Sequence, residues 1–270
     1  MNNLTEEKSI DSALLLDTAM LAAVIILENG GETFRAEETA YRICVAAGKN
    51  ETEVIALPTG IILSFNDDEG RKTSSLIRIK SRTYNLFRVE RTNFFARNFE
   101  NGSIGLDELN EKLSSLKNSI VTKKTFMCVA AGISSAMFTL LFEPALTISV
   151  VFDIFVTFIA SFFIQYLRVG TRLKNAYQFT LTFISSMVIA FLAILLTKTF
   201  GIGNLDYIII GAITPLLPGL SLTNAIRDTV TGDIISGTAR LAETLLIAIA
   251  IAGGIGIVLM GYINITGGAL

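Results

Sequence analysis

The sequence predicts a membrane α-helical protein, in which five transmembrane helices follow a small cytoplasmic α+β domain. Of its 46 charged residues, 34 lie in the first 124 positions and 12 in the remaining 146. Several apolar runs of about 20 residues, the length that spans a bilayer, lie in the second part. We therefore assign residues 1–122 to the cytoplasmic domain and residues 123–270 to a five-span transmembrane domain whose fourth span is broken by Pro and Gly.

The first domain shows helical and strand patterns in turn. Apolar residues recur at helical spacing from Ser12 to Glu28, Asn29-Gly30-Gly31 is a helix stop, and Thr33 caps a second helix that runs to Gly48. The β-rich runs and the two later amphipathic stretches are Glu53–Leu57, Gly60–Phe65, Ser74–Lys80, Tyr84–Phe99 and Leu106–Leu116. About 120 residues are enough to bury a core.

The transmembrane domain contains four clear apolar runs and one broken run. They are Thr125–Phe142, Ala145–Leu167, Ala176–Thr197, the broken Tyr207–Ile226 and Leu241–Ile263. Basic residues of the short loops fall mainly on one side of these spans, at Lys123, Lys124, Arg168, Arg172, Lys174, Arg227 and Arg240, with only Lys198 on the other. We expect a multi-pass protein of the cell (plasma, or inner) membrane, and the positive-inside rule predicts its orientation. Its N-terminal domain is cytoplasmic, its C-terminus is outside, and the Glu143-Pro144 corner faces outward.

The composition excludes several classes of function. The chain has no histidine and only two cysteines, so we expect no histidine-based metal site, Ser-His-Asp triad or disulfide framework. Neither half carries a concentrated basic surface, so nucleic acid is not an expected partner. No phosphate-binding loop, nucleophile elbow or dinucleotide glycine motif is present, and we expect no cofactor and no catalytic residue.

The broken span supplies the main candidate site. Prolines free backbone carbonyls that lipid cannot satisfy, so a break followed by polar residues is typical of a protein-enclosed cavity. An acidic residue within a span, Asp153, is functional by default, although it could also bond a neighbouring helix. The candidate substrate and coupling pathway comprises Asp153, Pro215, Pro218, Gly219, Asn224, Arg227, Asp228, Asp233, Arg240 and Glu243.

The charges after the break allow two interpretations. They form either a solvated cytoplasmic loop with positive-inside anchors, or tightly turned backbone close to a cavity, which Gly232 and Gly237 favour. Glu243 follows Arg240 at a helical spacing that permits an ion pair. In the soluble domain, Glu32, Arg35, Glu38 and Thr39 share part of one helix face, a pattern more typical of helix-dipole complementarity than of a site.

Three blocks of the sequence resemble the threonine/serine exporter family, from about Ser12 to Gly261. The blocks are GGETFRAEETAYRI, ALPTGIILSF and TPLLPGLSLTNAIRDTVTGDIISGTARLAE, followed by the last span. The resemblance implies a cytoplasmic domain and a carrier that moves small hydroxylated amino acids outward, and one branch of the family resembles succinate exporters. The family-like positions are Gly31, Glu32, Arg35, Glu38, Thr39, Pro58 and Gly60, then Pro215, Pro218, Gly219, Asn224, Arg227, Asp228, Gly232, Asp233, Gly237 and Arg240.

The span count suggests a particular kind of member. The resemblance implies about ten spans for the long single-chain members of the family. This chain, with five expected spans, is similar instead to the N-terminal half of the split members. A second five-span unit would complete an inverted repeat. We expect a secondary exporter of threonine and serine, driven by a proton gradient with Asp153 as the proton carrier. Its expected partners are a small amino acid or dicarboxylate substrate, the membrane, and a second small membrane subunit or further copies of itself. The alternatives are a succinate exporter subunit and, in another class, a membrane-anchored enzyme or regulator acting through the N-terminal domain.

Overall fold

A computed structural model describes residues 11–119, 123–142, 147–170 and 178–267. The chain is mainly helical, with one small sheet, and it divides into two compact units. The first unit comprises residues 1–121 and 220–241, and the second comprises residues 122–219 and 242–270. The Glu143-Pro144 corner and the loop residues Arg172 and Lys174 lie outside the described residues.

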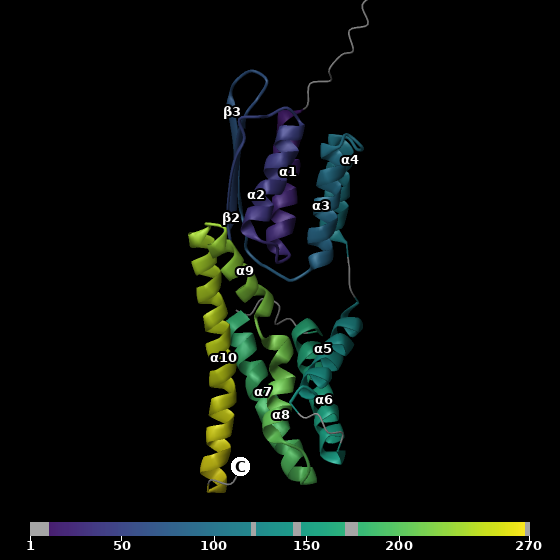
Figure 1. The fold of residues 1–270 in the computed structure, drawn as a ribbon, viewed down its shortest axis with the longest axis vertical. Helices are drawn as coiled ribbons and strands as arrows, with labels where there is room; N and C mark the ends of the chain where they lie inside the picture. The colour runs from purple at the N-terminus through teal and green to yellow at the C-terminus, as the bar shows by residue number, and fades with distance from the viewer. Residues whose placement is uncertain (1–10, 120–122, 143–146, 171–177, 268–270) are drawn as a thin grey trace, which may run out of the picture. The chain divides into compact units, whose positions relative to one another are not determined.

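The first unit is built around a buried helix. α1 (Ser12–Glu28) packs against α2 (Thr33–Ala46), α3 (Leu86–Glu100), α4 (Leu106–Asn118) and the sheet (Figure 1). Apolar side chains surround most of α1, which is why eleven of its 17 residues are buried. The Asp11 side chain caps its first turn by accepting a hydrogen bond from the N–H of Ala13, at 2.9 Å.

The sheet has three antiparallel strands in the order β1 (Glu53–Leu57), β2 (Gly60–Asn66) and β3 (Lys72–Arg78). Ile61, Leu63 and Phe65 alternate along β2 and face the core. The expected sheet is confirmed. The helices and strands between Ser12 and Asn118 begin and end within two residues of the predicted positions.

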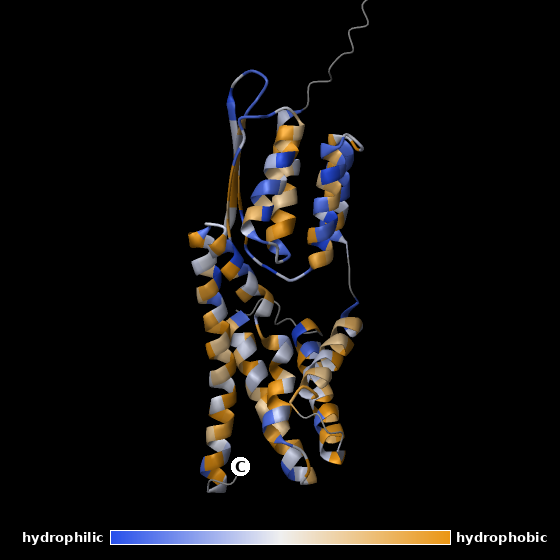
Figure 2. Ribbon diagram, viewed as in Figure 1, coloured by the Kyte–Doolittle hydropathy of each residue, from blue (hydrophilic) through white to orange (hydrophobic). Residues whose placement is uncertain are grey.

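The second unit contains the long apolar helices. They are α5 (Lys124–Thr139), α6 (Ile148–Gly170), α7 (Gln178–Phe200), α8 (Leu205–Ile213) and the part of α10 (Ile234–Thr266) that follows Leu241. Figure 2 shows that these helices carry mainly apolar residues, whereas α3 and α4 carry many hydrophilic ones. α6 packs against α5, α7 and α8.

By length and composition, three described helices can cross a membrane, namely α6, α7 and α10. A fourth span results if α8 with the 3₁₀ turn η2 (Thr214–Leu216), and α9 (Gly219–Val230), are counted as one bent pair. The chain is therefore a predominantly helical membrane protein. Five spans remain a prediction, since α5 has 16 described residues.

Candidate functional site

The break predicted at Pro215 and Pro218 lies between α8 and α9. The N–H of Thr214 bonds the carbonyl of Gly211, and the N–H of Leu217 bonds the carbonyl of Thr214 at 3.2 Å. In a regular α-helix these two carbonyls would accept the N–H groups of residues 215 and 218, but both residues are prolines and have no N–H. The shorter bonds, from the third residue onward instead of the fourth, satisfy the two carbonyls. The chain leaves the second compact unit directly after this break, because residues from Leu220 to Leu241 belong to the first.

Within the first unit, α9 packs on the turn between α1 and α2, residues 29–33, which we call the α1–α2 turn. The side-chain amide of Asn224 donates to the carbonyl of Gly30 at 2.8 Å. Arg227 forms an ion pair with Glu32. The hydroxyls of Tyr84 and Ser221 lie 2.6 Å apart and share a hydrogen bond. Two blocks of sequence that are far apart along the chain thus meet side by side.

The centre of this contact is a buried ion pair. The Asp228 carboxylate accepts the N–H of Thr33 at 3.2 Å and its hydroxyl at 3.0 Å, and its second oxygen lies 3.0 Å from Nε of Arg240. Arg240 also donates to the carbonyl of Gly31 at 3.0 Å. Asp228 is fully buried and Arg240 is 4% exposed, so each charge depends on the other for its stability. We call Thr33, Asp228 and Arg240 the buried triad.

Glycines give the backbone the shapes that the buried triad needs. Gly232, at φ 97°, ends α9, and the N–H of Asp233 then bonds the carbonyl of Asp228 at 2.8 Å, a Schellman turn that leads directly into α10. Gly237 allows α10 to approach α9, since a Cβ there would lie 2.1 Å from the Thr229 hydroxyl. The short turn and the close approach together bring Arg240 to Asp228.

A further carboxylate, Glu37 on α2, lies near this cluster. It accepts the N–H of Ala56 in β1 at 2.7 Å. Burial raises the pKa of Glu37 above its ordinary value, the N–H of Ala56 opposes this, and the negative charges of Asp233 and Asp228 raise it further. Nothing in the sequence pattern marked Glu37, because this environment depends on the tertiary packing.

The acidic and basic side chains at the start of α2 form a linked set. Glu32 is buried and contacts two arginines, Arg35 with one oxygen and Arg227 with the other. The predicted motif residue Glu38 lies 3.6 Å from Arg42. The hydroxyl of Thr39 donates to the side-chain oxygen of Asn93 at 3.1 Å.

The remaining motif residues of the N-terminal domain shape the hairpin between β1 and β2. Pro58 is buried in its two-residue turn, and Gly60 pairs with Leu57 across the turn. A Cβ on Gly60 would lie 3.2 Å from the carbonyl of Ile77 in β3. These two positions support the sheet and lie outside the contacts of the buried triad.

Asp153 belongs to the second unit, on α6, and is 1% exposed. Both of its oxygens accept the N–H of Asn204, at 3.0 and 3.1 Å. Asn204 in turn caps α8 by accepting the N–H of Asp206 at 3.0 Å. Gly203, at φ 101°, is required beside it, because a Cβ would lie 2.4 Å from an Asp153 oxygen. Asp153 therefore holds the turn that leads into α8.

The structure groups the predicted residues into separate places. Asn224, Arg227, Asp228 and Arg240 meet Gly31 and Glu32 in the first unit, whereas Asp153, Pro215, Pro218, Gly219 and Glu243 belong to the second. Sequence reasoning missed the roles of Gly30, Thr33, Tyr84 and Ser221 in this contact. Thr33 was expected to cap α2, but the N-cap is Glu32 and the Thr33 hydroxyl donates to Asp228 instead. This partner on α9 left no local pattern in the sequence.

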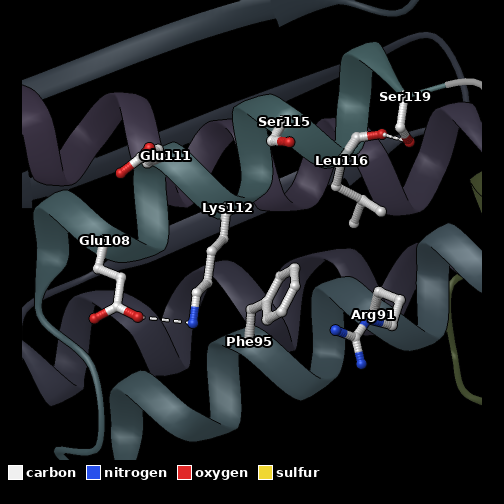
Figure 3. Close-up of a pocket in the computed structure, with 8 residues that line it drawn as sticks. All are labelled: Arg91, Phe95, Glu108, Glu111, Lys112, Ser115, Leu116 and Ser119. Carbon is white, nitrogen blue, oxygen red and sulfur yellow. Dashed lines mark hydrogen bonds and ion pairs between the residues drawn. The ribbon is translucent and has the colours of Figure 1, made fainter.

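A surface groove of about 480 Å³ lies between α3 and α4. Lys112 and Arg91 lie on either side of the Phe95 ring (Figure 3), with Arg91 4.8 Å and Lys112 5.7 Å from its centre. Lys112 also pairs with Glu108 at 2.7 Å. Of these contacts, the cation–π contact between Lys112 and Phe95 joins α4 to α3.

Comparison with known proteins identifies one family over most of the chain. A family model described as "Putative threonine/serine exporter" matches residues 17–262. The matched range includes both the motif block at the start of α2 and the break with the polar residues after it. No curated protein and no solved structure matches the chain.

Proposed function

Because the chain belongs to the threonine/serine exporter family, we propose that it exports small carboxylate-bearing metabolites, with threonine and serine as substrates. The family is one of transporters and not of enzymes, and the apolar helices make the chain a membrane protein. We place the N-terminal domain in the cytoplasm and the C-terminus outside the cell membrane, with five spans.

The observation that carries the proposal is the broken helix pair α8 and α9. Breaks of this kind are typical of transporter binding sites, because half-helix ends present backbone groups and dipoles to a substrate. Here the prolines stand where the chain passes from one compact unit to the other, and the half after the break is tied to the α1–α2 turn. The segment that follows the prolines thus contains Asp228, a member of the buried triad.

We propose that Asp153 carries the proton that couples export to a proton gradient. It is a buried carboxylate on an apolar helix, and its hydrogen bonds to the N–H of Asn204 make the start of α8 sensitive to its protonation. In proteoliposomes, Asp153→Asn is expected to keep substrate counterflow and to lose the dependence of uptake on a pH gradient. Asp206→Asn, an exposed carboxylate at the same helix start, is the control. Unchanged pH dependence in Asp153→Asn would reject this assignment.

The substrate is tested by efflux. Cells express this chain either alone or together with a small membrane protein encoded next to it in the genome. Both kinds of cell are loaded with labelled threonine, serine and succinate. Efflux of threonine and serine supports the proposal, and efflux of succinate alone supports the dicarboxylate alternative. Efflux that requires the neighbour identifies a second small membrane subunit, whereas no efflux of any of the three in either background contradicts the proposed function.

A further inference from the structure

A second, smaller groove lies on the first unit between α2 and α3. Its volume is about 60 Å³, and its lining is polar except for Ala96: Arg35, Glu38, Thr39, Arg42, Asn93, Ala96 and Arg97. Three arginines from two helices therefore line one small cavity. Arginines concentrated in this way are typical of sites that recognise carboxylate or phosphate groups.

The three arginines are not equally neutralised. Arg42 is held by Glu100 and lies near Glu38, and Arg35 is held through its Nε by Glu32. Arg97 is exposed in the last turn of α3 and forms no ion pair with any residue in the described part of the chain. The groove thus offers one unpaired guanidinium and the remaining donors of two others.

Asn93 adds neutral donors to the same cavity. Its side-chain oxygen is occupied by the hydroxyl of Thr39, at 3.1 Å. This bond orients the amide, so that its NH₂ group is the part still able to bind a ligand. The side-chain oxygen of Asn93 is therefore occupied within the protein, while its NH₂ group can donate to an anion.

We propose that the α2–α3 groove binds a small oxyanion, presented by a carboxylate or a phosphate group. The volume is about that of two water molecules. It accommodates the charged group of a metabolite, while the rest of the molecule stays on the open surface. The lining of the α2–α3 groove holds three arginines and one carboxylate, Glu38. The α3–α4 groove is less suited to an anion, because its two basic residues, Arg91 and Lys112, are matched by two carboxylates, Glu108 and Glu111.

Occupation of the groove would be transmitted through Glu32. An oxyanion bound to Arg35 competes with Glu32 for the same guanidinium, and the other oxygen of Glu32 pairs with Arg227 on α9. The anion therefore changes the charge balance at the contact that ties α9 to the α1–α2 turn. This regulatory consequence rests on the proposed export function, whereas anion binding itself does not.

The test is calorimetric titration of the purified full chain in detergent, with inorganic phosphate and, separately, with acetate. Saturable binding is expected for at least one of them, and the two titrations distinguish phosphate from carboxylate recognition. Arg97→Gln should weaken binding about tenfold or more. Arg78→Gln, an exposed arginine on β3 with the same change of charge, should leave binding unchanged.

A variant in the opposite direction separates binding from a merely structural role. Glu32→Gln removes the internal competitor for Arg35, so it should tighten oxyanion binding, provided that circular dichroism shows a native fold. Equal binding in wild type and Arg97→Gln, or no saturable binding of either anion to the wild type, would overturn the proposal. If efflux fails while anion binding persists, the export function is rejected and the groove assignment stands.

Discussion

Replacement of Asp228 by Asn is the sharpest test of the buried triad. The substitution keeps the size of the side chain and removes only its charge. The amide oxygen can still accept the N–H of Thr33, but the NH₂ group now faces Arg240 and the Thr33 hydroxyl, which also donate. Arg240, 4% exposed, is left as a buried charge without this counter-ion.

The expected cost follows from that burial. Removal of one partner of a buried ion pair destabilises a protein by about 3–5 kcal/mol, because the remaining charge is desolvated without compensation. Every 1.4 kcal/mol changes an equilibrium constant about tenfold. The population of molecules in which the first unit is open should therefore rise by roughly two to three orders of magnitude or more.

The two cysteines provide the assay. Cys44 is fully buried in the core of the first unit, and burial raises its thiol pKa to about 12, so alkylation requires opening. Cys128 is buried in the second unit. Mass spectrometry of alkylated peptides from one sample gives both rates. Asp228→Asn should accelerate the alkylation of Cys44 by roughly two to three orders of magnitude. The alkylation rate of Cys128 should stay near that of wild type.

A double-mutant cycle completes the test. Arg240→Gln alone should also be costly, since it isolates Asp228, but the combination with Asp228→Asn should cost less than the sum by about 2 kcal/mol or more. Additive effects would show that the two side chains act independently. A Cys44 rate in Asp228→Asn equal to that of wild type would refute the reasoning outright.

Two further predictions concern close packing and pH. Gly237→Ala places a methyl group 2.1 Å from the Thr229 hydroxyl and against the α9 backbone, so it should cost about 1–3 kcal/mol in thermal unfolding. Gly256→Ala, whose Cβ would meet nothing within 4 Å, should be neutral or stabilising by up to about 1 kcal/mol, because alanine favours a helix. Equal effects of the two substitutions would contradict the close approach. Because the pKa of Glu37 is raised in the folded state, that state binds more protons, and stability falls as pH rises from the ordinary value of 4.5 through the raised pKa. Glu37→Gln should flatten the Tm profile in this window, and an unchanged slope would exclude Glu37 as its source.

Local signals explain why much of the fold of the N-terminal domain could be predicted. Gly30 ends α1 because a left-handed residue is needed there, and its φ is 84°. The turn before β3 follows from Asp67, whose side chain accepts the N–H groups of Glu69 and Arg71 at 3.0 and 2.8 Å. Each signal lies within a few residues of the feature that it specifies.

The candidate site depended on information of another kind. Helical spacing pointed to Glu243 as a partner for Arg240, but it gave no signal for Asp228. Asp228 lies 3.0 Å from Nε of Arg240 because Gly237 allows α10 to approach α9. The bond between Thr33 and Asp228 joins residues 195 positions apart. The prediction that α9 lies beside the bilayer came from hydropathy alone. A contact between residues so far apart in the chain leaves no periodic pattern that could have predicted the packing of α9 on the α1–α2 turn.

The contact between α9 and the α1–α2 turn has a consequence for biosynthesis. At about 5–20 residues per second, Asp228 leaves the ribosome roughly 10–40 seconds after Thr33. The apolar helices α5 to α8 are made during that interval. The domain synthesised first therefore cannot finish folding until the membrane segments have been translated, and a nascent chain arrested before Leu220 exposes the bare surface of the α1–α2 turn to chaperones and proteases.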